Sequence, residues 1–412
     1  MEAVVSSGDI SDHLIDGLNF KAGSGTAQYV INSRYARYFS ESGNRFDPSS
    51  SRVIRFRLAD NVFLEPASCR VQMTITNLNG AAALTPIAPP LSMFRRARLF
   101  VSSQICEDWT ELGASTVLMD RMKDTLRRSN DSLDSHILTG GGSSDTYSAI
   151  PGGASRKVLM QLPFGVINSP KWIPLGLVSG GLIIELELGD AADAFNEADA
   201  NWQIEGVSMH ATVHEVDPAL ANSYTQHVLK GSPLHLPFQS MVVTKHLITD
   251  GDFRLSLVRG FTRLKQIYVT LHKSGDKFNR DFHHPIGANA VTSSNDTLQY
   301  QLQIGSRKWP ERAVESLAET FMRYRQAVGV FLGSDSVSIS PADFHQKKAV
   351  FSIDLEKVGH SALYSGYSTK DGSIVSIDFK NTGLGASGDS ALVYMVYDGI
   401  LSLRDGSADV FE

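Results

Sequence analysis

The chain has 412 residues, of which 42% are hydrophobic and 20% charged, with 34 Gly, 15 Pro and only 2 Cys. This balance excludes a disordered chain, and two cysteines are too few for a disulfide scaffold or an all-cysteine metal site. The net charge of -6 argues against a dedicated nucleic-acid binder, because such proteins usually carry excess positive charge.

The sequence also shows no recognisable targeting signal. The first nine residues carry neither the basic nor the apolar segment of a secretory signal, and no apolar run approaches the ~18 residues that span a bilayer. We therefore expect a globular protein that is made inside the cell.

Short runs of alternating apolar and polar residues dominate the chain. Residues 69–76 and 207–214 alternate in this way, and Leu298–Ile304 does so without an error. A period of two puts one face of a strand against a core. The other predicted strands are 53–58, 94–101, 157–162, 182–188, 241–248, 263–271, 349–355, 373–379 and 391–403. Gly, Ser, Asn and Pro separate them, which is typical of β-sandwiches and barrels.

Two segments have the spacing of amphipathic helices. In 109–128, Asp108 can cap the helix, and in 310–328, Pro310 suits the first turn while Gly329 provides the end. Basic residues near their C-terminal ends fit the helix macrodipole, and we interpret them as a solvated face: Lys123, Arg127, Arg128, Arg323 and Arg325.

The halves of the chain repeat one another. Four matches occur in the same order: 73–75 with 269–271 (offset 196), Trp109 with Trp309 (offset 200), 157–162 with 348–353 (offset 191) and 181–188 with 372–379 (offset 191). The final strands, 202–216 and 391–403, also correspond, without a fixed register. Each half has room for about eight strands, the size of a jelly roll.

The repeat predicts an all-β fold of two tandem jelly-roll β-sandwiches with a few short helices in loops. We divide the chain into an N-terminal arm at 1–50, a first jelly roll at 51–217, a linker at 218–235, a second jelly roll at 236–404 and a C-terminal tail at 405–412. The arm is rich in Ser, Gly and Asn with interspersed Tyr and Arg, so it cannot form a core of its own.

Candidate catalytic and metal-binding residues are few. Glu185 and Glu187 project from one face of a predicted strand, where paired carboxylates of a hydrolase could lie, although a solvated face is the commoner explanation. His210 and His214 share one face of another strand, and His283-His284 lie in a loop beside Pro285; a duplicated metal-binding cupin would also need a His-x-His pair, which the sequence lacks.

A family resemblance enters at residues 99–109. Their sequence, LFVSSQICEDW, resembles the strand–GQxxED–helix segment of double jelly-roll major capsid proteins, with Ser103 at the position of the usual Gly. Residues 305–311 together with 321–329 resemble the matching segment of the second roll. The similarity is greatest to the polinton-like virus and virophage type, within the lineage of adenovirus hexon.

The resemblance implies a viral structural protein of the capsid, with no catalytic residues, metal or cofactor. It implies a homotrimer that forms a pseudo-hexameric capsomer of an icosahedral virion, assembled inside the host cell. Implied partners are neighbouring capsomers, penton and minor capsid proteins and, as a further candidate, an inner membrane, but no sequence-specific nucleic acid. The arm and the loops 78–93, 139–153 and 274–296 are candidate contact or outer surfaces. A double-jelly-roll glycan-directed hydrolase or glycan-binding protein is the alternative.

Overall fold

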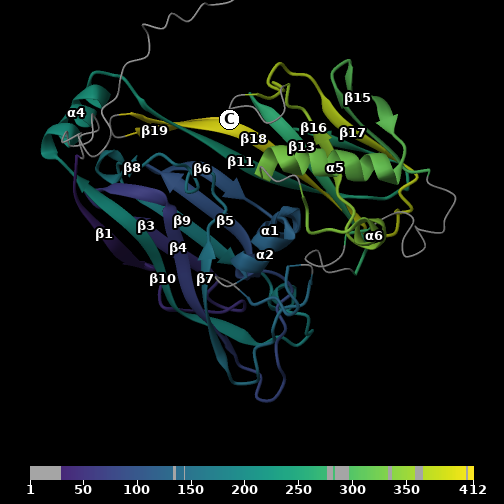
Figure 1. Cartoon of the computed structure of the whole chain (residues 1–412), viewed down its shortest axis with the longest axis horizontal. Helices are drawn as coiled ribbons and strands as arrows, with labels where there is room; N and C mark the ends of the chain where they lie inside the picture. The colour runs from purple at the N-terminus through teal and green to yellow at the C-terminus, as the bar shows by residue number, and fades with distance from the viewer. Residues whose placement is uncertain are drawn as a thin grey trace, which may run out of the picture.

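The computed structural model describes residues 29–132, 136–142, 144–275, 282–283, 297–332, 336–357, 365–404 and 407–412. These residues form four antiparallel sheets, arranged as two tandem jelly-roll β-sandwiches. Figure 1 shows the first sandwich at the lower left, in purple to teal, and the second at the upper right, in green to yellow. The fold is therefore all-β with short helices in its connections, as predicted.

The first roll contains two sheets, which we call its long-strand and short-strand sheets. The long-strand sheet has the order β1 (Val30–Phe39), β10 (Trp202–Val216), β4 (Phe63–Asn77) and β7 (Ser155–Gln161), with β2 (Arg45–Phe46) on β10 and β8 (Ile173–Pro174) on β4. The short-strand sheet has the order β3 (Val53–Leu58), β9 (Leu182–Leu188), β5 (Phe94–Val101) and β6 (Gln104–Trp109).

The second roll repeats this order strand for strand. Its long-strand sheet runs β11 (Leu234–Leu247), β18 (Ser390–Arg404), β13 (Leu264–His272) and β16 (Phe351–Asp354), with β19 (Ser407–Phe411) on β18. Its short-strand sheet runs β12 (Phe253–Leu257), β17 (Val375–Lys380), β14 (Gln299–Ile304) and β15 (Arg307–Val314). Every strand predicted from alternation overlaps one of these elements.

The register of the strands confirms the repeat at single residues. Trp109 pairs with Ala97, whose partner on the other side is Leu186. Trp309 pairs with Leu302, whose partner on the other side is Ile377. Because Leu186 and Ile377 differ by the predicted offset of 191, the two tryptophans occupy the same place in the two short-strand sheets.

One pair of offsets disagrees in the long-strand sheets. Met160 pairs with Val71, whereas Phe351, its predicted counterpart, pairs with Val269. With an offset of 196, the counterpart of Val71 falls two residues before Val269, the observed partner of Phe351. The two predicted offsets are therefore two residues out of register with each other. Two residues are one period of the pleat, so the same side chains still face the core.

The predicted helices are shorter and displaced. The segment 109–128 contains two helices, α1 (Leu112–Met122) and α2 (Thr125–Asp131); Asp108 caps neither, because it still belongs to β6, and the Asp124 carboxylate caps α2. In 310–328 the prediction is wrong for its first residues, since Pro310 lies within strand β15, next to a cis peptide bond. The helix α5 runs from Leu317 to Leu332, past Gly329.

Two connections contain more regular structure than predicted. Residues 30–46 of the predicted arm form β1 and β2 of the first roll, while residues 1–28 of the arm lie outside the described residues. The predicted linker contains α4 (Pro218–Leu229). Asp217 caps the start of this helix, because its carboxylate accepts a hydrogen bond from the Ala219 N–H at 2.8 Å. The pattern of alternating apolar and polar residues does not reveal β1, because neither face of this strand is strongly apolar.

The remaining helices are short and lie in connections. They are the 3-10 helices η2 (Pro90–Met93) and η3 (Leu175–Leu177), and the α-helices α3 (Ala191–Ala194) and α6 (Pro341–Gln346). Loops 78–93 and 139–153 pair with one another through Leu84 and Ile150, whereas most of loop 274–296 lies outside the described residues. No helix in the described part of the chain is long and apolar enough to cross a membrane.

Candidate functional site: the roll-to-roll seam and the open sheet face

The predicted carboxylates of β9 lie in ion pairs between strands. Glu185 contacts Arg98 and Glu187 contacts Arg95, both on the neighbouring strand β5. The second roll has the same arrangement, in which Arg254 of β12 donates two hydrogen bonds to Asp378 of β17 and lowers the pKa of that carboxyl. Glu185 and Glu187 thus hold strands together, and neither lines the cavity described below.

The predicted histidine pair lies on the outer face of β10. The His210 ring is tilted against Tyr35, with 5.4 Å between ring centroids, and the His214 ring stacks on Trp172 at 3.9 Å. His214 also lies 3.4 Å from the Glu65 carboxylate. Among the described residues, which include His283 but not His284, no group of three or more His, Cys, Asp or Glu is placed to hold a metal ion.

A buried carboxylate joins the two rolls. Glu107, at the end of β6, is fully buried and accepts hydrogen bonds from the backbone N–H groups of Gly165 and Val166, each at 2.9 Å. Its carboxylate also accepts the hydroxyl of Ser240, which belongs to β11 of the second roll. Burial raises the pKa of Glu107, and these hydrogen bonds oppose that rise. We call this contact region the seam.

Backbone contacts continue the seam along β11. The Thr110 hydroxyl donates to the carbonyl of Val243 at 3.0 Å. A Cβ atom at Gly165 would lie 1.9 Å from the carbonyl oxygen of Gln239, so only glycine fits there. The edge strand β6 and the segment after it are therefore fitted closely to β11.

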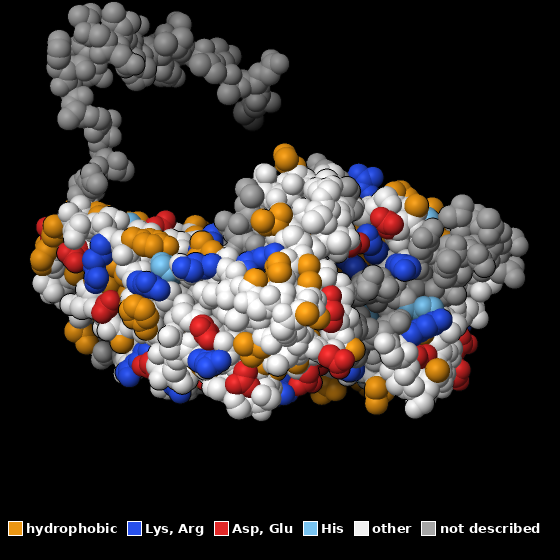
Figure 2. Space-filling model, turned by 90° about the horizontal axis from the view of Figure 1, so that it is seen from below, with side chains coloured by type: hydrophobic (Ala, Val, Ile, Leu, Met, Phe, Trp, Pro, Cys, Tyr) orange, Lys and Arg blue, Asp and Glu red, His pale blue; other side chains and the backbone are white. Residues whose placement is uncertain are grey.

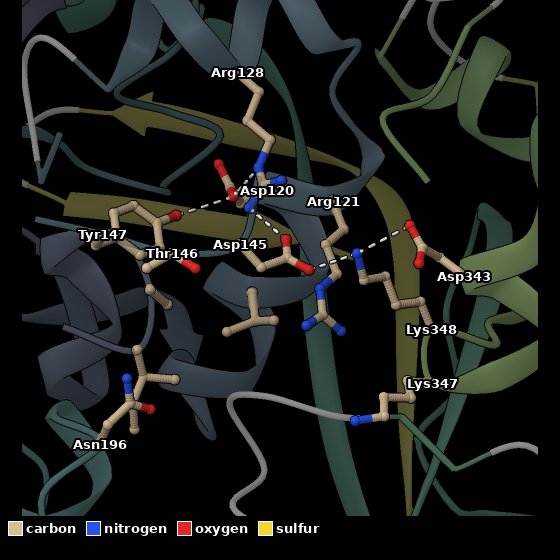
Figure 3. Close-up of a pocket in the computed structure, with 13 residues that line it drawn as sticks. Asp120, Arg121, Arg128, Asp145, Thr146, Tyr147, Asn196, Asp343, Lys347 and Lys348 are labelled. Atoms are coloured by element: carbon tan, nitrogen blue, oxygen red, sulfur yellow. Dashed lines mark hydrogen bonds and ion pairs between the residues drawn. The ribbon is translucent and has the colours of Figure 1, made fainter. Parts of the chain in front are cut away.

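Charged side chains complete the seam at its other end, around a cavity of 330 Å³ (Figure 3). Arg128 of α2 pairs with Asp120 at 2.6 Å and with Asp145 at 2.9 Å. Asp145 in turn contacts Lys348 of the second roll, which lies 3.4 Å from Asp343. The charges alternate in sign from one roll to the other, as the dashed lines in Figure 3 show.

This network corrects the prediction of a solvated basic face for Arg128, whereas Arg127 and Arg325 are exposed as predicted. Arg128 is only 4% exposed, and although burial alone would lower its pKa, Asp120 and Asp145 raise it above the ordinary value. A buried arginine of this kind is retained because it is paired and hydrogen-bonded. The sequence did not reveal that Arg128 and Glu107 are buried. The reason is that the local EDW and RR patterns resemble those of solvated strand and helix ends.

The outer faces of the two long-strand sheets can be compared position by position. The outer face is the one turned away from the short-strand sheet of the same roll. Aligning the sheets at their β-bulges places the pair His210–Arg70 over Val396–Gln266. In the same register Phe39, which pairs with Ser208, corresponds to Val243, which pairs with Tyr394.

The corresponding positions differ sharply in exposure. In the second roll, Met241 and Val243 of β11 are buried at the seam. In the first roll, Phe39 is 66% exposed, Tyr35 is 65% exposed, and Arg37 between them is exposed. We call the outer side of β1 and β10 the open face. Figure 2 shows hydrophobic, basic and histidine side chains intermixed toward its left side, over the first roll.

Comparison with known proteins supports the fold. No family model and no curated protein matches this chain. Among solved structures, the chain is similar to the quasi-atomic model of the PBCV-1 virus capsid, with a TM-score of 0.66 at 10% identity over 95% of this chain and 98% of that chain. The Sputnik virophage structure has a TM-score of 0.57 at 10% identity over 98% and 93% of the two chains.

The major capsid protein of Faustovirus is similar to the same degree, with a TM-score of 0.57 at 10% identity over 95% of this chain and 93% of that chain. The similarity includes both rolls and their connection, since the coverage is nearly complete on both sides. This chain thus has the double jelly-roll fold of viral major capsid proteins.

Proposed function

We propose that this chain is a viral major capsid protein, located in the virion, whose function is structural and not enzymatic. The observation that carries the proposal is the fitted seam between two rolls of identical strand order, in a fold shared along almost the whole chain with virus capsid proteins. A rigid unit of two similar rolls is a building block that can approximate a hexagon when three copies combine.

The capsomer in this proposal is a homotrimer that presents six rolls in a pseudo-hexagonal outline. Its partners are neighbouring capsomers, penton and minor capsid proteins, and an inner membrane is a further candidate. The net charge of -6 supports a shell that encloses a genome without binding it tightly, because extensive phosphate contacts need clustered Lys and Arg. Assembly takes place inside the host cell, and the boundaries at 1–50, 51–217, 218–235, 236–404 and 405–412 remain proposals apart from the corrections above.

Sedimentation velocity and electron microscopy of the purified protein test this proposal. We expect a species with three times the 44.9 kDa mass of the chain and particles with a six-sided outline. A chain that stays monomeric at high concentration would contradict the proposal.

The glycan-directed alternative predicts a different result. Glu185→Gln and Glu187→Gln should abolish hydrolysis if these carboxylates are catalytic. In a capsid protein they should leave assembly unchanged, because each removes only one strand-to-strand ion pair at a partly exposed site. Hydrolysis of a glycan panel by the wild-type chain, lost in Glu185→Gln, would favour the enzyme.

A further inference from the structure

A lysine and two carboxylates lie together inside the second roll. Lys265 Nζ is 2.6 Å from Glu356 Oε1 and 3.8 Å from Asp398 Oδ1. The Lys265 side chain is 7% exposed, and the side chains of both carboxylates are 0% exposed. Taking three charges out of water costs free energy that their mutual attraction offsets only in part. A role as a plain ion pair therefore explains this cluster poorly.

Three neighbouring strands hold the cluster. β13, which contains Lys265, lies between β18, which contains Asp398, and β16, which ends just before Glu356 (Figure 1). The register of β13 and β18 shifts at Lys265, and such a bulge re-aims a side chain. The Lys265 carbonyl accepts a hydrogen bond from the Leu355 N–H at 2.8 Å, and the Asp398 N–H donates to the Arg263 carbonyl at 3.1 Å. These backbone hydrogen bonds fix the place where the three side chains meet.

The first roll shows that the fold does not require this cluster. In the register that aligns the β-bulges of the two long-strand sheets, the three equivalent positions contain no charged residue. They are occupied by Cys69, Pro163 and Thr212. A jelly roll of the same strand order thus closes without a lysine or a carboxylate at these places, so the cluster has a role particular to the second roll.

Glu356 is placed to move protons. Its Oε1 contacts Lys265 Nζ and accepts a hydrogen bond from the Ser365 hydroxyl at 2.9 Å, so the carboxylate is oriented. Its Oε2 is buried and has no hydrogen-bond partner among the described residues. A carboxylate within hydrogen-bond reach of an amine can take up its proton, which makes the nitrogen a nucleophile. The contact of this nitrogen with Asp398 is close to the roughly 3–3.5 Å separation of atoms poised to react.

We propose that Lys265 and Asp398 form an isopeptide bond in the folded chain, with Glu356 carrying the protons. The lone pair of Lys265 Nζ forms a bond to Asp398 Cγ, and one Cγ–O bond breaks. Nζ loses two protons, which Glu356 takes up one at a time and delivers to the departing oxygen, so the oxygen leaves as water. Glu356 ends in its starting state, and no oxidant or other reactant is needed. The product contains a neutral amide in place of two buried charges.

The bond joins two strands that are far apart in the sequence. Lys265 and Asp398 are more than a hundred positions apart, and a cross-link that closes so long a loop strongly restricts the unfolded chain. We expect the cross-linked chain to resist unfolding and to migrate faster on a denaturing gel. The proposal goes beyond the capsid function and does not depend on it, because the bond lies within one chain and forms in monomer and trimer alike.

Mass spectrometry of the denatured full-length chain tests the bond directly. We expect an intact mass lower by one water molecule than the sequence requires. A protease digest should contain a branched peptide that joins the segments around Lys265 and Asp398. A folded wild type with the full mass of its sequence would overturn the proposal, and a branch at Glu356 in place of Asp398 would overturn the roles given to the two carboxylates.

Two variants should keep the full mass of their sequences. Lys265→Arg retains the positive charge, but a guanidinium does not give up its proton and so does not attack a carboxyl. Glu356→Gln retains both bonding partners and removes the proton carrier. Circular dichroism should show that both variants fold and that they melt at a lower temperature than the wild type. A bond that still forms in Glu356→Gln contradicts the role of Glu356.

Lys348→Arg is the matched control. Lys348 also contacts two carboxylates, those of Asp145 and Asp343, but their side chains are 36% and 48% exposed, so water competes for them. This variant should lose one water molecule, as the wild type does. A full mass in Lys348→Arg would place the cross-link at Lys348 and overturn the assignment of Lys265.

A succinimide at Asp398 is the competing explanation for a lost water. The backbone nitrogen of Gly399, the next residue, can attack the same Cγ with the same loss of mass. That ring forms without Lys265, so a loss of water that persists in Lys265→Arg counts against the isopeptide bond. Hydroxylamine opens a succinimide and leaves an isopeptide bond intact. We therefore expect the mass deficit of the wild type to survive hydroxylamine, and its disappearance would overturn the proposal.

Discussion

The two long-strand sheets have one topology and two different uses. In the second roll, β13 and nearly all of β18 are buried on both faces. In the first roll, β4, the counterpart of β13, alternates between buried and partly exposed residues, and β1 is exposed along most of its length, with only Ala36 buried. Because strand order is the same, the difference comes from what lies on the outer face: the first roll and helix α5, whose Phe331 contacts Tyr268, cover the second sheet, whereas no described segment covers the first sheet at Tyr35 and Phe39.

The side chains reflect this difference. The outer face of the second sheet contains buried aromatic and polar groups that satisfy each other, such as Thr270, whose hydroxyl lies 3.3 Å from the Tyr394 hydroxyl and 2.9 Å from His272 Nε2. The outer face of the first sheet contains Arg, His and aromatic groups with partial exposure. Identical folding patterns thus carry either a buried seam or an exposed face.

Equivalent substitutions on the two outer faces should show the largest difference in the free energy of unfolding. Val243→Asp places a carboxylate in the buried seam, so we expect the free energy of unfolding to fall by about 3–5 kcal/mol. Phe39→Asp, at the equivalent position, should change it by no more than about 0.5 kcal/mol in the isolated chain. Urea unfolding of dilute protein measures both, and similar losses would show that the two positions are not equivalent.

The next largest effect concerns the carboxylate in the seam. In Glu107→Gln, one carboxylate oxygen becomes an amide NH2 that faces the N–H of Gly165 or Val166, so we expect a loss of about 2 kcal/mol in the free energy of unfolding. Glu187→Gln is the matched control, because its partner Arg95 is exposed, and it should cost less than about 1 kcal/mol. Equal effects would mean that the seam is solvated.

The stability difference between the wild type and Glu107→Gln should depend on pH, and the sign of that dependence follows from the pKa of Glu107. Burial raises the folded-state pKa of Glu107 above its unfolded value, so the folded state binds this proton more tightly. The associated stability is fully present below the unfolded pKa of roughly 4.3 and is lost as the pH rises through the folded value. The stability difference between wild type and Glu107→Gln should therefore be largest in acid and shrink toward neutral pH.

The sequence predicts the parts of this fold that depend on local periodicity. Alternation located the strands, and the offset between Leu186 and Ile377 located the same strand in both rolls. Helix ends were less predictable, because Pro310 suits both the first turn of a helix and an edge strand, and tertiary pairing with β14 decides between them.

The seam could not be predicted, for a physical reason. Arg128 and Glu107 belong to segments with polar patterns. Glu107 accepts a hydrogen bond from Ser240, 133 positions away, and Arg128 pairs with Asp145 across the loop that follows α2. Burial of a charge becomes visible only when the partner charge or hydrogen-bond donor is placed beside it. The exposure of the open face was equally hidden, because it stands out only when β1 is compared with β11.

A smaller effect is expected where aromatic stacking stabilises the first sheet. Trp172 stacks on His214 with an interplanar angle of 11°, whereas the Tyr35 and His210 rings are tilted by 36°. Trp172→Ala should lower the free energy of unfolding by about 1 kcal/mol, and Tyr35→Ala by less. A double-mutant cycle with His214→Ala measures the pair directly; a coupling near zero would show that Trp172 contributes through burial alone.

The smallest effect tests how the charge of Arg37 acts on the open face. Burial and, after it, the charge of Arg37 hold the pKa of His210 below its usual range. Arg37→Gln should raise that pKa toward roughly 6.5, as an NMR titration of the imidazole would show. Arg34→Gln is the control, because Arg34 lies 3.7 Å from Asp60 and 3.9 Å from Glu215 instead. An unchanged pKa in Arg37→Gln would show that burial alone lowers the pKa of His210.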